Sequence, residues 1–422
     1  MSPTARVAFA LAGLAALALV LPVGLVFLAA LAVVTATVVD AVAARRPPTV
    51  SREVPALLAL GVGVPLVVDA GTAGSVRVRL RQPVPPGLEV TPSEADARLE
   101  AVLIGRRRGR HLLPAAAARS TGPLGLGRFD HRRGAAAEVL VYPDLPAAER
   151  LALAVRQGKF ADQGRMTRGA LGLGTDFESV RDYTPDDDIR QVNWLATARL
   201  ARPMSNQYRV DQDRDVICVV DLGRLMAAPL PGAGPGAAPI SRLDAALDAV
   251  AAVALVADEV GDRCGTVAFD AEVKRRLSPR RRGGRAVIEA LFDLEPAAVD
   301  SDYELAFRSV GGGKRGLVLV LTDLLEESAA RPLVEAIPVL ARRHAVVVAS
   351  AADPDVLGLV RTPPATPLDA YAASVAIEVL EARDRVTAQL TRAGARVVEA
   401  PPDRLGVGCV SAYLTLKSRA RL

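Results

Sequence analysis

The feature that most restricts the fold of this chain is an apolar run near its amino terminus. From Val7 to Val39 there is no charged residue, and Pro22 interrupts the run near its middle. As one helix the run would be about 50 Å long, whereas the hydrocarbon core of a bilayer is roughly 30 Å thick. We therefore predict two short membrane spans that reverse at Leu21–Gly24, so that residues 1–46 form a transmembrane hairpin.

A secretory signal peptide is the alternative interpretation of this run, because Arg6 precedes it and small residues follow it. The apolar core of a signal peptide is only about 7 to 15 residues long, however, which is too short for this run. Arg6 on one side and Arg45–Arg46 on the other are basic, and basic residues stay on the cytoplasmic side of a membrane. We expect a two-span protein of the inner or plasma membrane with cytoplasmic soluble domains.

The cysteines indicate a reducing compartment. Cys218, Cys264 and Cys409 are far apart in the sequence, odd in number and surrounded by apolar residues. This pattern is typical of buried free thiols and not of a disulfide framework.

The basic residues do not indicate nucleic-acid binding. The net charge is +5, and three arginine-rich clusters lie at 106–108, 274–276 and 280–282. No aromatic residues alternate with them to stack on bases. We expect these clusters to be solvated loops or loops that face anionic membrane lipid.

Residues 47–146 show the pattern of a small β-sandwich. Apolar and polar residues alternate over Ser75–Arg81, a proline-rich turn follows at Pro83–Pro86, and Glu138–Tyr142 is a second strand. Short strands with frequent turns are typical of an antiparallel sandwich. We expect this domain to be a spacer or docking module.

Residues 211–422 alternate between strands and helices, which predicts an α/β domain with a doubly wound, mostly parallel sheet. The expected strands are 215–220, 264–269, 316–321, 345–349 and 396–399. The expected helices are Arg242–Glu259, Gly284–Leu294, Asp302–Val310, Glu326–Ala341 and Ala372–Ala393.

Between these domains, the segment 147–210 holds the most polar stretch and the only tryptophan, Trp194. Thr184 followed by Pro185 is a typical helix start, and we expect this helix to run to about Leu200. Acids cluster here with arginines: Asp176, Glu178, Asp182, Asp186, Asp187, Asp188, Arg181, Arg190, Arg199 and Arg202. Clustered carboxylates alone do not make an active site, so we interpret them first as ion pairs in which Arg181, Arg190 and Arg199 bind Asp176, Asp182 and Asp187.

The order of residues in this segment resembles the bacterial family called domain of unknown function 58. The resemblance lies in Gly174–Glu178, Arg181–Tyr183, Pro185–Asp187, Arg190, Asn193–Trp194 and Ala198–Arg199. It departs from the family pattern at Asp176, Asp186 and Asn193, where Glu, Gly and Asp are usual. The signature residues that follow from it, as structural or interaction residues, are Asp176, Glu178, Arg181, Tyr183, Asp187, Arg190, Trp194 and Arg199.

The resemblance also implies an architecture and partners. Members are similar to von Willebrand factor A domains, often carry two membrane spans, and are linked with MoxR-type AAA+ ATPases. The resemblance therefore implies a von Willebrand A-like fold for the α/β domain and such an ATPase, or a client envelope protein, as partner.

Two predicted strands end in an acid, Asp221 and Asp323, at the edge where α/β sheets bind ligands. The resemblance implies a metal-ion-dependent adhesion site there, with Ser301 as a third residue and Mg²⁺ as the ion. Its two serine positions are Gly223 and Leu225 in this chain, and Arg224 adds a positive charge. We expect a degenerate site with no cofactor, in which hydrogen bonds or an arginine hold Asp221.

Enzyme motifs are absent from the sequence. There is no phosphate-binding loop, no HExxH and no paired CxxC, and the Gly311–Lys314 run precedes its strand instead of following one. We expect a non-enzymatic membrane-anchored adaptor whose α/β domain binds a protein. The alternative is a metal-dependent hydrolase or transferase that uses the carboxylates of Asp176–Asp188 with Asp221; it requires several of these acids at one cavity.

Overall fold

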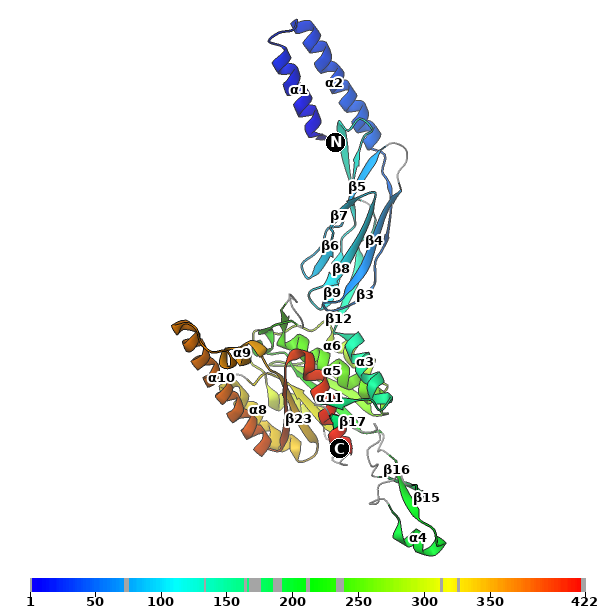
Figure 1. The fold of residues 1–422 in the computed structure, drawn as a ribbon, viewed down its shortest axis with the longest axis vertical. Helices are drawn as coiled ribbons and strands as arrows, with labels where there is room; N and C mark the ends of the chain where they lie inside the picture. The colour runs from blue at the N-terminus through cyan, green and yellow to red at the C-terminus, as the bar shows by residue number, and fades with distance from the viewer. Residues whose placement is uncertain are drawn as a thin grey trace. The chain divides into compact units, whose positions relative to one another are not determined.

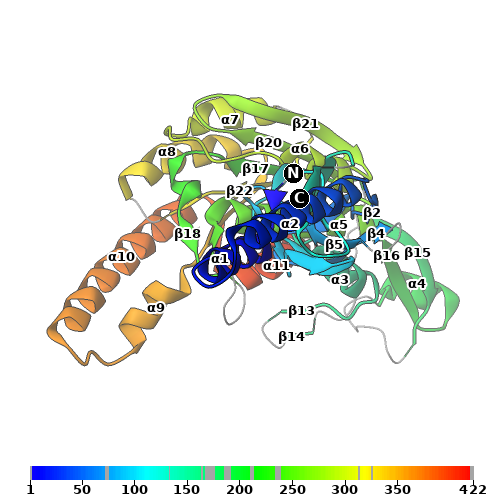
Figure 2. The same ribbon diagram turned by 90° about the horizontal axis from the view of Figure 1, so that it is seen from above.

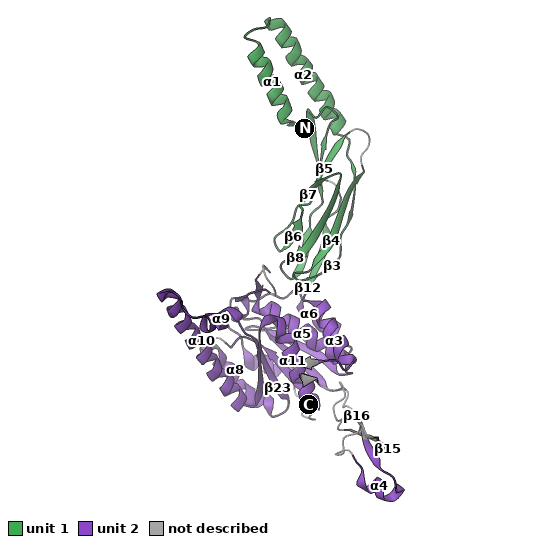
Figure 3. Ribbon diagram, viewed as in Figure 1, with its two compact units in different colours: residues 1–142 green, residues 143–422 purple. Residues whose placement is uncertain are grey.

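The computed structural model in Figure 1 describes residues 2–71, 76–132, 134–162, 165–166, 176–184, 192–209, 213–232, 239–311, 314–324 and 327–418. The chain divides into two compact units, Met1–Tyr142 and Pro143–Leu422, which Figure 3 distinguishes by colour.

The first unit begins with two apolar helices that lie side by side, α1 (Ala5–Leu17) and α2 (Val23–Ala44) (Figure 1). The chain reverses between them, in the region where the sequence predicts a turn. Helix α2 has a mean hydropathy of 2.4 over its most apolar window and is largely exposed, so its length and composition fit a membrane span. Helix α1 is apolar but shorter. An apolar helix of this kind indicates membrane localisation.

The carboxyl-terminal end of α2 is fixed to the β-sheets of the same unit by a buried carboxylate. Asp40 is 2% exposed, and its Oδ1 accepts a hydrogen bond from Leu124 N at 2.8 Å. Its Oδ2 accepts bonds from Leu126 N at 2.7 Å and Gly127 N at 2.8 Å. Gly127 has no room for a side chain, because a Cβ would overlap the backbone of Ala41. The carboxyl-terminal end of α2 therefore packs closely against the turn at residues 122–127.

The β-sheets of the first unit enclose one apolar core that includes Leu66, Leu80, Leu99 and Leu103. Three sheets have the strand orders β1-β11-β10-β5-β7, β2-β4-β8-β6 and β3-β12-β9. Their strands are β1 (Ser2–Pro3), β2 (Thr49–Glu53), β3 (Leu57–Ala59), β4 (Gly63–Gly71), β5 (Arg77–Arg81), β6 (Leu88–Thr91), β7 (Glu94–Asp96), β8 (Arg98–Gly105), β9 (Gly109–Leu113), β10 (Ala117–Thr121), β11 (Gly127–Arg132) and β12 (Ala137–Tyr142).

The second unit is built on a mixed sheet of six strands in the order β21-β20-β17-β22-β23-β24. All neighbouring pairs are parallel except β20 with β21. The strands are β17 (Asp215–Asp221), β20 (Arg263–Phe269), β21 (Val273–Arg281), β22 (Leu317–Leu321), β23 (Ala345–Ala351) and β24 (Ala395–Ala400). The strands β17, β20, β22 and β23 are almost wholly buried because helices cover both faces.

On one face α5 (Arg242–Glu259) contacts α3 (Leu145–Arg156), α6 (Gly284–Leu291) and α11 (Pro402–Ser418). On the other face α8 (Glu327–Ala341) contacts α7 (Tyr303–Val310) and α10 (Pro367–Arg392). Helix α9 (Pro354–Arg361) lies beside α10, and Figure 2 shows the two running away from the sheet. The strands expected in this domain are all present, and the helices agree in position with small shifts at their ends.

Two predictions about this unit are wrong. The cluster 274–276 and the first two arginines of the cluster 280–282 lie in the antiparallel edge strand β21 and not in loops. An edge strand pairs on one side only, and the arginines of this strand extend into solvent. Because its sequence is polar, it lacks the apolar pattern from which a strand is predicted. The second concerns the helix expected from Thr184 to Leu200, of which residues 185–191 lie outside the described residues. Val192 forms a β-bridge with Ser205, and α4 covers only Trp194–Leu200, with the Asn193 side chain capping it.

The remaining strands are short or lie in the signature segment. Strands β15 (Asp176–Asp182) and β16 (Met204–Arg209) form an antiparallel pair with a bulge near Phe177–Ser179. The others are β13 (Ala161–Asp162), β14 (Arg165–Met166), β18 (Pro229–Leu230) and β19 (Ile240–Ser241), and a 3₁₀ turn, η2, spans Arg224–Ala227.

Candidate functional site

The strand order places the predicted acids where a doubly wound sheet changes direction. From β17 the chain crosses first to β20 on one side and then to β22 on the other. Loops diverge at such a switch point, which leaves a crevice at the carboxyl ends of the strands. Asp221 ends β17 and Asp323 follows β22, so both acids lie at this switch point.

The Asp221 carboxylate is buried, at 3% exposure, and four hydrogen-bond donors surround it. Its Oδ1 accepts bonds from Gly223 N at 2.7 Å and from the hydroxyl of Ser301. Its Oδ2 accepts bonds from Thr322 Oγ1 at 2.6 Å and Tyr303 Oη at 2.8 Å. One backbone N–H and three side-chain hydroxyls thus bind the carboxylate.

Tyr303 is the part of this cluster that sequence reasoning missed. Its Oη lies 2.8 Å from Thr322 Oγ1 as well as 2.8 Å from Asp221 Oδ2, so the phenol packs against both oxygens of the Thr322–Asp221 hydrogen bond. Burial raises the pKa of Tyr303 well above its usual value, and the nearby Asp221 carboxylate adds to the effect. The phenol therefore stays protonated and remains a donor. A tyrosine two residues after Ser301 gives no distinctive signal in the sequence.

Gly223 explains how Ser301 reaches the carboxylate. A Cβ at position 223 would overlap the Ser301 hydroxyl. The glycine therefore removes one side chain from the turn, and the hydroxyl of Ser301 takes its place beside Asp221.

Asp323 faces a different partner. Its Oδ1 accepts a hydrogen bond from Arg242 Nη1 at 3.0 Å, and the two side chains are 1% and 4% exposed. Arg242 Nη1 also donates to the Ala351 carbonyl at 2.9 Å. Burial lowers the pKa of Arg242, and the charge of Asp323 opposes that shift. Sequence reasoning missed Arg242, although a cation in the first turn of an apolar helix is unfavourable and so indicates a buried partner.

The residues at this edge do not fit Mg²⁺. The ion needs an octahedral set of oxygen ligands, mostly carboxylates and waters. Asp323 is paired with Arg242, and the Tyr303 phenol and the Thr322 hydroxyl both donate to the same oxygen of Asp221. What remains is one carboxylate with neutral hydroxyls. The described residues contain no group of three or more His, Cys, Asp or Glu placed to hold a metal.

Arg224 forms an ion pair with Asp300. Its Nε lies 2.7 Å from Asp300 Oδ1, and both side chains are exposed. The described contacts that hold Asp221 are the hydrogen bonds given above.

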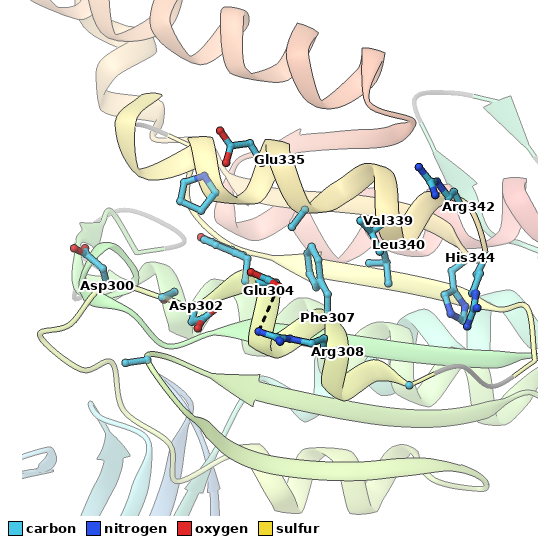
Figure 4. Close-up of a pocket in the computed structure, with 17 residues that line it drawn as sticks. Asp300, Asp302, Glu304, Phe307, Arg308, Glu335, Val339, Leu340, Arg342 and His344 are labelled. Carbon is cyan, nitrogen blue, oxygen red and sulfur yellow. Dashed lines mark ion pairs between the residues drawn. The ribbon is translucent and has the colours of Figure 1, made fainter.

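Two cavities open at this edge. A small one of about 300 Å³ is lined by Asp221, Gly223, Ser301 and Tyr303 among others. A larger one of about 990 Å³, which we call the α7–α8 groove, runs between these two helices (Figure 4). The cavities share lining residues, among them Ser301, Tyr303 and Pro332.

The signature residues are only partly covered by the structure. Asp187 and Arg190 lie outside the described residues, and for Asp176 and Glu178 only the strand β15 is described. Tyr183 is half-buried, whereas Arg181 and Arg199 are exposed. Trp194 is 70% exposed on α4. Among the described residues, Asp182 forms an ion pair with Arg202 at 3.1 Å, and the pairs expected with Arg181, Arg190 and Arg199 stay a prediction.

Fold and site define the class as a membrane-associated α/β protein whose strand-end acids are held by internal contacts. The chain belongs to the family described as "Protein of unknown function DUF58", whose model matches residues 179–398, just over half of the chain. This match confirms the family resemblance of the signature.

Its relatives are themselves uncharacterised. The chain is 29% identical over 190 residues to uncharacterized protein Rv1480 of Mycobacterium tuberculosis and equally to uncharacterized protein Mb1516 of Mycobacterium bovis. The match covers 43% of this chain and spans 56% of the length of each relative. A solved structure, of an uncharacterized membrane spanning protein from Vibrio fischeri, is 16% identical with a TM-score of 0.20, covering 49% of this chain and 99% of that one.

Proposed function

We propose that this protein is a non-enzymatic, membrane-anchored adaptor whose α/β unit binds another protein. The proposal rests on the contacts of Asp221 and Asp323, the two acids at the strand ends. Both oxygens of Asp221 accept hydrogen bonds, and Asp323 is ion-paired. A general base or a metal ligand needs a free lone pair toward the substrate, and these oxygens face internal donors instead.

The open feature at the same edge is suited to binding a protein. The α7–α8 groove has apolar side chains on its floor and charged side chains on its rims. That combination, an apolar centre with a polar rim, is typical of protein interfaces. The sheet order is compatible with the von Willebrand A-like fold that the signature implies, and we include that fold in the proposal.

The expected partner is a MoxR-type AAA+ ATPase, on the basis of the family resemblance. The chain carries no phosphate-binding loop of its own, so an energy-driven role requires an ATPase in trans. The adaptor would hold that partner, or an envelope client, at the membrane surface.

A photo-crosslinker placed at Glu335, on the exposed rim of the groove, tests the proposal in intact cells. The expected result is a crosslink to an AAA+ ATPase that is identified by mass spectrometry. The matched control places the same group at Arg361, an exposed position on α9. Equal labelling of the ATPase from both positions, or none from Glu335, would count against the adaptor role.

Two membrane spans with a cytoplasmic α/β unit complete the proposal. The two apolar helices α1 and α2 and the arginines on both sides of them support this topology. Protease added outside intact spheroplasts should leave residues 51–422 uncut. Cleavage from that side would exclude a cytosolic partner.

A further inference from the structure

The floor of the α7–α8 groove is apolar and reaches the surface. Phe307 of α7 is 8% exposed and Leu340 of α8 is 6% exposed, so both lie below the rims. Val339 of α8 also lines the groove but is 68% exposed. A bound side chain that covers Val339 and reaches Phe307 would remove apolar surface from water, at about 25 cal/mol per Å². A flat bilayer surface does not reach a floor that lies below charged rims.

The acidic side chains along the groove already have partners within the protein. Asp300 binds Arg224 at 2.7 Å, and Asp302 accepts a hydrogen bond from Leu305 N at 2.9 Å as the cap of α7. The other two lie on the helices themselves, and they are paired there as well: Glu304 with Arg308 at 3.4 Å, and Glu335 with Arg331 at 2.9 Å. Their charges are largely balanced locally, so this part of the groove does not require a cation.

The opposite end of the groove has unbalanced positive charge. Arg342 and Arg343 follow α8 directly, both are exposed, and neither forms an ion pair with a described residue. His344 is next to them and is 4% exposed. Its Nδ1 is buried and has no hydrogen-bond partner among the described residues. Figure 4 shows Arg342 and His344 together at one end and Asp300, Asp302 and Glu335 toward the other.

We propose that the α7–α8 groove binds a segment of a partner protein that presents apolar side chains followed by a carboxylate. The apolar side chains cover Val339 and contact Phe307, and the carboxylate binds Arg342 and Arg343. Arginine forms bidentate hydrogen bonds with carboxylates, which fixes the end of the groove at which the acidic residue lies. A groove between two helices is a known mode of peptide recognition. The inference rests on the proposed adaptor function and names the chemistry of its partner.

Selection from a phage-displayed library of random peptides, on the detergent-purified full chain, tests this inference. The wild-type chain should enrich peptides in which two or more apolar residues precede Asp or Glu. Affinity for the enriched peptides should fall about tenfold or more in the double variant R342E/R343E, because two charge-assisted contacts are lost and replaced by repulsion. V339D should lose binding to a similar extent.

Matched controls are R361E and V360D, which change an exposed arginine and an exposed valine on α9 outside the groove. Both should bind the peptides as the wild type does. The inference is overturned if no peptide is enriched, if the enriched peptides show no acidic preference, or if the groove variants bind like the controls. All variants alter exposed side chains, and an unchanged melting temperature verifies that they are folded.

The same variants separate this inference from the adaptor role. If R342E/R343E and V339D still crosslink to the native ATPase as the wild type does, the adaptor function stands and the groove is not its binding site. If the groove selects acidic peptides but no partner is captured in cells, the groove chemistry stands and the adaptor function fails.

Discussion

The strand-end edge, by which we mean the edge of the sheet where Asp221 and Asp323 lie, adjoins the α7–α8 groove. The two regions differ in whether their charged groups have partners. At the edge, Asp221 has four donors and Asp323 has a buried arginine. In the groove, Arg342 and Arg343 have no described partner. Residues with satisfied charges stabilise a fold, whereas exposed unpaired cations beside apolar surface can recognise a ligand. The difference indicates that the edge is structural and that the groove is the part available to a partner.

The largest effect should come from breaking the buried pair at the edge. Arg242→Ala leaves Asp323 buried without its cation, and such a change typically costs about 3 to 5 kcal/mol. The matched change Arg224→Ala removes an exposed pair with Asp300 and should cost under about 1 kcal/mol. Denaturant unfolding of the full chain in detergent measures both. Similar losses in the two variants would show that burial does not distinguish these pairs.

A smaller effect is expected from the phenol that binds Asp221. Tyr303→Phe removes one donor from a buried carboxylate and should cost about 1 to 3 kcal/mol. Tyr371→Phe is the control, because Tyr371 is 70% exposed on α10. Thermal unfolding should separate the two variants. If the two variants unfold at the same temperature, the three remaining donors are sufficient for the Asp221 carboxylate.

The smallest effect should be a pH dependence of stability that comes from His344, at the end of the groove. Burial lowers the pKa of His344 below its ordinary 6.5, and the charge of Arg343 contributes. The unfolded chain therefore binds a proton that the folded chain does not, so stability should fall as the pH drops below about 6.5. His344→Gln should lose this part of the pH dependence, whereas His111→Gln, at an exposed position, should retain it. Melting temperatures at pH 7.5 and 5.5 provide the comparison.

Much of the α/β unit follows from its sequence because buried strands are continuous apolar runs. Asp215–Asp221 and Leu317–Leu321 are of this kind, and the helices between the strands have regular apolar periods. Strand β21 was missed because an exposed edge strand rich in arginine lacks that pattern. Helix α4 begins only at Trp194, because Val192 forms a β-bridge and the Asn193 side chain is the N-cap, and these are contacts that a helical period does not show.

The position of the candidate site could be predicted from the sequence, but the contacts of its acidic side chains could not. The sequence places Asp221 and Asp323 at one edge, because parallel strands end together. It does not show that Tyr303 and Thr322 donate to Asp221, or that Arg242 crosses to Asp323, since these pairs are 81 to 101 residues apart. The groove has no sequence motif at all, because its lining comes from two helices, the segment before α7, the turn after α8 and single residues of other loops.

Calorimetric titration of the full chain with Mg²⁺ and Mn²⁺ is the most direct test of whether internal contacts, and not a metal ion, hold the strand-end acids. If Asp221 is held by internal hydrogen bonds and Asp323 by Arg242, neither ion should give saturable heat below about millimolar concentration, and Asp221→Ala should behave like the wild type. Saturable binding in that range that is lost in Asp221→Ala would contradict the account, because the strand-end edge would then be a working metal site.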